Sequence, residues 1–303
     1  MSLYLPIAQI SMDLSLLIGL GLGVGILSGM FGIGGGFILT PMLIFLGVPP
    51  AIAVGTGASQ VVASSVSGAL GNWKRGNVDV QLGLVLLAGG LFGSSLGIRL
   101  QQWLAAAGQL EVFTASIYVI MLGLVGGLML TESVRTLAGA TPEGKTDTGG
   151  TPRLDRLPFK RRFPVARLYT SVIPPLASGT LVGLLTAIMG VGGGFLLVPL
   201  LIYVIRVPTK IALGTSGFQI VFLTAYTTVL QAVSNHSVDI FLAAPLIAGG
   251  VIGAQIGVRI GERLSGAHLR LLLALLVLTV AVRMGYDLTV QPAELFNLQN
   301  INP

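Results

Sequence analysis

Long apolar runs separated by short polar stretches dominate this chain. A membrane-spanning helix needs about 20 mostly apolar residues, because a helix rises about 1.5 Å per residue and the hydrocarbon core is about 30 Å thick. Several runs have this length, and two reach only about half of it. The predicted segments are 14–31, 37–46, 51–70, 80–100 and 111–130 in the first half, and 168–189, 195–205, 210–231, 240–260 and 269–286 in the second.

The composition supports a membrane protein. Only 9% of the 303 residues are charged and the mean hydropathy is +0.90, whereas a soluble domain carries about 25% charged residues. The net charge of +6 does not indicate nucleic acid, because the basic residues cluster between apolar runs without interleaved aromatics. We therefore expect an all-α integral membrane protein with about 8–10 membrane segments and the lipid bilayer as its surroundings. Residues 1–15 lack Lys and Arg, so the first apolar run predicts a permanent helix, not a cleaved signal.

The polar stretches divide the chain into four parts. Residues 132–167 are rich in basic residues, Gly, Pro and Thr, which is typical of a solvated linker. We expect a first transmembrane repeat over 1–131, this linker, a second transmembrane repeat over 168–286, and a polar tail over 287–303.

The two halves are copies of one unit. GIGGGFILTP at 32–41 recurs as GVGGGFLLVP at 190–199, and VGTGASQ at 54–60 recurs as LGTSGFQ at 213–219. The pair VD recurs at 78–79 and 238–239, and AGGLFGSSLGIR at 88–99 recurs as AGGVIGAQIGVR at 248–259. The offset stays near 158–160 residues over four blocks, which chance similarity between apolar segments would not maintain.

The basic residues predict how the halves are oriented, because Lys and Arg concentrate in cytoplasmic loops. An odd number of segments per half inverts the second half and places 15 basic residues inside, with only Arg99 and Arg283 outside. Parallel halves give 11 inside and 6 outside. We therefore expect inverted repeats in the cell (plasma or inner) membrane, both termini outside, and a cytoplasmic linker.

The short segments 37–46 and 195–205 each follow a Gly-rich break and lie near a Pro. Interrupted segments at matching positions of two inverted halves are typical of the substrate site of a secondary transporter. Successive glycines leave backbone N–H groups uncovered at a helix start, which is a ready site for an oxyanion. The first candidates for solute binding are the two glycine triplets, Gly34, Gly35 and Gly36 with Gly192, Gly193 and Gly194. Close helix packing is the alternative role for these glycines.

Neutral polar side chains follow each break. Thr56 and Gln60, matched by Thr215 and Gln219, lie four residues apart and hence on one helix face. Together with Ser59 they are further candidates for solute binding, unless they only bond neighbouring backbone.

Two acidic residues and a second glycine pattern have more ordinary predicted roles. Asp79 and Asp239 precede apolar segments, where helix capping is expected and coupling to protons is the alternative. Glycines spaced by four at 89, 93 and 97, and again at 249, 253 and 257, predict close helix packing.

No sequence pattern for other chemistry is present. The chain has no Cys, no His/Glu cluster for a metal, no Ser with a plausible His partner, and no P-loop. We expect no enzyme activity, no cofactor and no bound metal.

The motifs at 32–41 and 190–199, with the Gly-Thr-x-x-x-Gln blocks at 55–60 and 214–219, resemble the sulfite exporter TauE/SafE family. The resemblance runs from about residue 14 to 286. It implies a permease for sulfur oxyanions or organosulfonates, such as sulfite or sulfoacetate, moved outward. The residues themselves indicate only a small anion, moved by alternating access between the repeats. An anion channel or uniporter, a transporter of another solute such as a metal ion, a membrane scaffold, and a homo-oligomeric assembly stay open.

Overall fold

The computed structural model describes residues 2–31, 34–137, 158–261 and 266–289, and helices account for most of them. The first half contains α1 (Leu14–Phe31), α2 (Gly36–Phe45), α3 (Pro50–Lys74), α4 (Val80–Ala106) and α5 (Leu110–Leu137). The second half contains α6 (Ile173–Met189), α7 (Gly194–Pro199) with the π-helical turn η2 (Leu200–Val204), α8 (Thr209–Ser234), α9 (Ile240–Gly261) and α10 (Gly266–Thr289). The all-α fold and the short helix after each Gly-rich break are confirmed.

Four helices in the described ranges are long and apolar enough to cross a membrane by length and composition: α4, α5, α8 and α9. Shorter apolar helices cover Leu14–Met30, Gly36–Phe45, Ile173–Met189, Gly194–Val204 and Leu271–Tyr286. Large apolar side chains such as Phe92, Trp103, Ile120 and Leu128 are exposed on these helices. Lipid tails are the surroundings that such a surface requires.

One β-hairpin precedes the helices of each half, and neither hairpin was predicted from the sequence. Strands β1 (Ser2–Leu5) and β2 (Ile10–Asp13) pair before α1, and β3 (Lys160–Phe163) and β4 (Leu168–Ser171) pair before α6. The predicted segment 168–189 therefore begins as a strand. The predicted linker 132–167 is narrowed at both ends, since α5 continues to Leu137 and β3 begins at Lys160. Residues 138–157 and 290–303 lie outside the described part.

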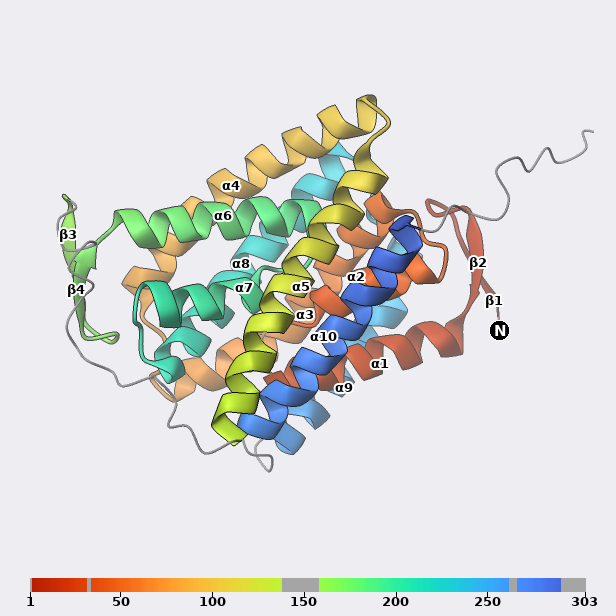
Figure 1. Ribbon diagram of the computed structural model, residues 1–303. Helices are drawn as coiled ribbons and strands as arrows, with labels where there is room; N and C mark the ends of the chain where they lie inside the picture. Colours follow the sequence, from red (N-terminus) through yellow and green to blue (C-terminus); the bar gives the residue numbers. More distant parts are fainter. Residues whose placement is uncertain (1, 32–33, 138–157, 262–265, 290–303) are drawn as a thin grey trace, which may run out of the picture.

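The two halves interlock by exchanging helix partners. Helix α1 packs along α9 and its counterpart α6 packs along α4, while α3 packs on α8 and α5 on α10. The two hairpins lie at opposite ends of the helical body, and α5 and α10 run side by side across one face (Figure 1). The α1–α9 and α4–α6 packings are therefore counterparts, and the α3–α8 and α5–α10 packings each join two equivalent helices.

Glycines make the two tightest helix crossings possible. A methyl group at Gly93 or Gly183 would overlap the carbonyl of Thr180 or Gly90 across the α4–α6 crossing. At the α1–α9 crossing, a methyl group at Gly253 would overlap the Leu22 carbonyl in the same way. The packing role predicted for the glycines spaced by four is confirmed.

Candidate functional site

The two Gly-rich breaks meet at the centre of the protein, between α3 and α8. A Cβ on Gly34 or on Gly192 would contact the same two side chains, Val61 of α3 and Ile220 of α8. Both glycines have left-handed backbones, with φ of 73° and 75°, a region that favours glycine. The first aromatic residues of the two short helices also meet there, since the Phe37 and Phe195 rings lie 5.8 Å apart between centroids.

Two backbone N–H groups of the first break already make hydrogen bonds within the protein. The Gly35 N–H donates to the Ser28 hydroxyl at 2.9 Å, and the Gly36 N–H donates to the Gly34 carbonyl at 2.8 Å. Two of the backbone donors predicted for an anion are thus already paired in this conformation. The Ser65 hydroxyl adds an unpaired side-chain donor beside the break.

The second break has more glycines with a left-handed backbone than the described part of the first break has. Gly193 also has a positive φ, of 69°, and a Cβ there would lie 2.7 Å from the Thr186 hydroxyl oxygen. Gly194 begins the short helix α7 and is buried. These glycines lie at the break, as the sequence predicts.

Gln60 and Gln219 are completely buried on α3 and α8. Each lies against a glycine of a neighbouring helix, Gln60 on Gly250 of α9 and Gln219 on Gly90 of α4. Neither amide atom of Gln60 has a hydrogen-bond partner, and Gln219 donates to the Leu86 carbonyl at 3.3 Å while its oxygen has no partner. Because unpaired buried amides are rare, they stay good candidates for contact with a polar solute.

Thr56 and Thr215 connect the two halves. The Thr56 hydroxyl accepts from the Asp239 backbone N–H at 3.1 Å, and the Thr215 hydroxyl accepts from the Asp79 N–H at 3.0 Å. Ser59 donates to the Thr56 carbonyl at 2.6 Å. These contacts give all three residues a structural role in this conformation. The sequence suggested bonds to neighbouring backbone as the alternative to solute binding, whereas Thr56 and Thr215 bond the backbone of the other half.

Asp79 and Asp239 fasten the hairpins to the opposite half. Asp79 caps α4 at the Leu82 N–H (3.1 Å) and accepts from Val165 and Ala166 in the β3–β4 turn at 3.1 and 2.9 Å. The buried carboxylate is thereby surrounded by backbone donors.

Asp239 repeats the arrangement. It caps α9 at Phe241 and Leu242, and it accepts from Ile7 and Ala8 in the β1–β2 turn at 3.0 and 3.4 Å. The predicted capping is confirmed at both residues, and the fastening of a hairpin is a second role that the sequence does not reveal.

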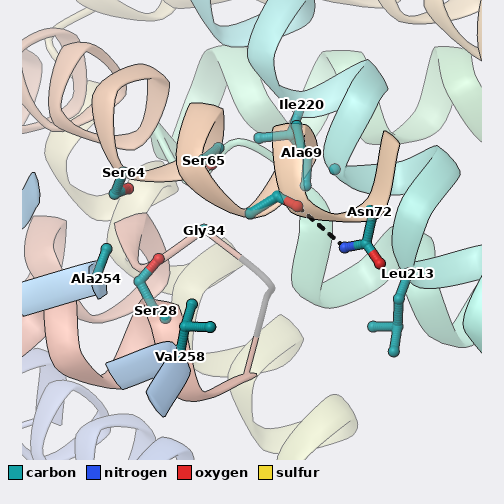
Figure 2. Close-up of a pocket in the computed structure, with 13 residues that line it drawn as sticks. Ser28, Gly34, Ser64, Ser65, Ala69, Asn72, Leu213, Ile220, Ala254 and Val258 are labelled. Carbon is teal, nitrogen blue, oxygen red and sulfur yellow. Dashed lines mark hydrogen bonds between the residues drawn. The ribbon is translucent and has the colours of Figure 1, made fainter. Parts of the chain in front are cut away.

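A small cavity lined by both polar and apolar side chains lies beside the first break. It has a volume of about 30 Å³, which is room for a water molecule. Figure 2 shows Gly34 between Ser28 of α1 and Ser65 of α3. The remaining lining comes from α1, α3, α8 and α9, and none of the described residues that line the cavity is charged. We call this space the α1–α3 cavity.

The α1–α3 cavity lies toward the end of the protein that carries the β3–β4 hairpin. Asn72 lines it near the C-terminus of α3 and Leu213 lines it near the N-terminus of α8. The adjoining loop continues to Asp79, which holds the hairpin turn. Sequence reasoning missed Ser28 because it lies before the break and outside the repeated motifs.

The equivalent region beside the second break is occupied by polar side chains that hydrogen-bond to one another. Ser94 of α4 and Thr227 of α8 bond through their hydroxyls at 2.8 Å. Gln231 donates to Gln101 at 2.7 Å and to the Ala187 carbonyl at 3.1 Å, and it accepts from Asn235 at 2.7 Å. Ser237 completes the cluster with a bond to Gln231 at 3.1 Å. We call these six side chains the polar seal: Ser94, Gln101, Thr227, Gln231, Asn235 and Ser237.

The fold and the central site define a class of protein. Interlocked apolar helices, together with two short helices that follow Gly-rich breaks and meet at the centre of the protein, are features of a multi-pass membrane transport protein. The chain belongs to the family described as sulfite exporter TauE/SafE, whose model matches residues 17–284.

Curated relatives agree with this class. The chain is 25% identical to the probable membrane transporter protein YunE of Bacillus subtilis, over 91% of this chain and 98% of the relative. It is 30% identical to a probable membrane transporter protein of Xylella fastidiosa, over 88% of this chain and 94% of the relative. A probable membrane transporter protein of Methanocaldococcus jannaschii, MJ0441, is 26% identical over 86% and 91% of the two chains. No solved structure matches. The protein is thus a membrane transporter and not an enzyme.

Proposed function

We propose that this transporter moves a small anion, sulfite or an organosulfonate, out of the cell by alternating access between two inverted repeats. One observation supports this most strongly. A cavity that serine and asparagine side chains help to line lies beside one Gly-rich break, while hydrogen-bonded side chains occupy the equivalent region beside the other. Two copies of a unit in different states are what alternation between repeats requires.

The chemistry of the centre supports an anion. The α2 N-terminus places the positive end of its dipole at the first break, and the lining contains hydroxyl groups without acidic side chains. A metal ion would be served by clustered His, Cys, Asp or Glu, and no such cluster occurs in the described ranges. The sulfur in the proposed solute follows the family description.

The distribution of basic residues predicts which side of the membrane the cavity faces. If the 71–79 loop is cytoplasmic, the α1–α3 cavity faces the cytoplasm and the polar seal faces outside. The basic residues Lys74, Lys210 and Arg259 are exposed near this end, where they favour the approach of an anion. The arrangement fits export, with loading from inside.

Flux of sulfite and of sulfoacetate into proteoliposomes tests the proposal, with the wild type beside Gln60→Ala and Gln219→Ala. Ser116→Ala is the matched control, because this exposed hydroxyl on α5 bonds only its own helix. We expect saturable flux in the wild type and the control, and a loss of at least about tenfold in the glutamine variants. Absence of flux with either solute would discard the sulfur anion and leave the transporter class standing.

A further inference from the structure

We infer that the hydroxyls of Ser28 and Ser65 hold the oxygen atoms of the solute in the α1–α3 cavity. We further infer that Thr186 and Thr224 replace them when the protein opens on its other side. This inference rests on the proposed anion transport and assigns the ligands of its site.

Ser65 supplies an unpaired donor. Its side chain is 8% exposed and its hydroxyl has no hydrogen-bond partner. The oxygen lies 3.0 Å from the position that a Cβ on Gly34 would occupy, so it is aimed at the break. Burying a hydroxyl without a partner is costly, which a solute oxygen in the cavity would relieve.

Ser28 supplies a second donor on the opposite side of the same break (Figure 2). Its oxygen accepts the Gly35 N–H at 2.9 Å. A hydroxyl has one hydrogen and two lone pairs, so accepting this bond leaves the Ser28 hydrogen to donate. The Gly35 dipole also polarises the hydroxyl, because Gly35 is the N-cap of α2.

The Ser28 and Ser65 hydroxyls determine which class of solute the cavity can bind. Both hydroxyls can donate, none of the described lining residues is charged, and one lone pair of Ser28 is already engaged. The site therefore suits a compact anion with at least two oxygens on one centre. Of the proposed solutes, sulfite fits this site better than a bulkier organosulfonate, because Gly34 leaves only the space of a missing side chain between the two serines.

The second half carries the same pair in another state. By the repeat offset, Thr186 corresponds to Ser28 and Thr224 to Ser65. Both threonines donate to their own helices, Thr186 to the Val182 carbonyl at 2.7 Å and Thr224 to the Ile220 carbonyl at 2.6 Å. The Thr224 methyl lies 3.0 Å from the Cβ position of Gly192, so Gly192 faces a methyl group where Gly34 faces the Ser65 hydroxyl.

The test measures sulfite flux in right-side-out and inverted membrane vesicles that contain the full-length protein. The variants are Ser28→Ala, Ser65→Ala, Thr186→Val and Thr224→Val, with Ser116→Ala as control. Loss of one hydrogen bond to an anion corresponds to about a tenfold weaker interaction. We expect the serine variants to raise the half-saturating sulfite concentration about tenfold on the cavity side, and the threonine variants to do so on the other side.

The outcomes separate the two levels of the proposal. Wild-type vesicles without sulfite flux from either side would remove the proposed function and this inference together. Normal wild-type flux with half-saturation unchanged in Ser28→Ala and Ser65→Ala would overturn the inference alone, and so would an equal rise on both sides for every variant. The Ser65→Ala variant separates solute contact from a structural role, because the Ser65 hydroxyl has no partner to lose. The inference requires Ser65→Ala to keep the wild-type unfolding temperature in detergent, and a lowered temperature would instead indicate a structural role.

Discussion

The two halves of this transporter share a fold and differ in how tightly their centres are closed. Beside the first break, Ser65 has an unpaired hydroxyl next to a cavity. Beside the second, Thr227 and Gln231 are bound into the polar seal. The repeat offset places Gly68 and Asn72 where the sealed half has Thr227 and Gln231. Under the proposed alternating access, these small changes of side chain bias which side is closed.

The difference between the halves predicts which cysteine pairs will cross-link. Ser94→Cys with Thr227→Cys replaces hydroxyls 2.8 Å apart, so a disulfide should form nearly completely under mild oxidant. The equivalent pair across the cavity, Gly68→Cys with Ala254→Cys, should remain largely reduced. The chain has no natural cysteine, so gel mobility after oxidation reports each pair cleanly. Equal cross-linking of the two pairs would remove the asymmetry on which the comparison rests.

Because Asp79 and Asp239 hold the two hairpins in the same way, we expect their replacement to cause equal losses of stability. Asp79→Ala and Asp239→Ala each leave several buried backbone N–H groups without an acceptor, each at a cost of about 1–3 kcal/mol. We expect both variants to lose at least about 3 kcal/mol of stability, measured by chemical unfolding in mild detergent. Asp79→Asn and Asp239→Asn keep an acceptor oxygen and should retain more stability. A stable Asn variant that loses only proton-dependent flux would point to coupling instead.

The polar seal should weaken when its central amide is removed. Gln231→Leu breaks the bonds to Gln101, Asn235 and Ser237, which should destabilise the sealed state by about 2 kcal/mol. Thiol labelling of a Ser94→Cys reporter should then accelerate by about tenfold or more. Asn72→Leu at the equivalent position should change the labelling little, because Asn72 bonds only the Gly68 carbonyl. Labelling that is insensitive to Gln231→Leu would mean that the seal does not control access.

The smallest effects are expected at the threonines that connect the halves. Thr56→Val and Thr215→Val each remove one acceptor from a backbone N–H, of Asp239 and Asp79 respectively. We expect a loss of about 1 kcal/mol from each, seen as a small fall in unfolding temperature. A loss of flux without a loss of stability would restore Thr56 and Thr215 as solute ligands.

Much of the fold could be predicted because apolar length and repetition are local properties. The helix starts at Leu14, Val80 and Ile240 agree with the predicted segments, since lipid requires a continuous apolar run. The hairpins could not be predicted, because their strands are short and mixed in polarity. Residues 160–163, for example, read as a basic loop, and they are ordered by Asp79, which lies far away in the sequence.

The positions of the two Gly-rich breaks could be predicted, but the hydrogen bonds made by the donors beside them could not. The repeated glycines located both breaks, because only glycine adopts the left-handed backbone at Gly34 and Gly192 without strain. Which donors stay free depends on tertiary contacts. The Gly35 N–H is engaged by Ser28, and Thr56 by the loop of the other half. Neither pairing has a signal in the linear sequence.

One measurement tests the central claim most directly, namely that solute crosses only when the two halves move against each other. Ser94→Cys with Thr227→Cys is bridged by dibromobimane, whose thioether links sulfite cannot cleave, and sulfite flux is compared with that of the treated Ser94→Cys single variant. We predict that bridging abolishes saturable flux while the single variant retains it. Undiminished sulfite flux through the bridged protein would contradict alternating access and favour a channel.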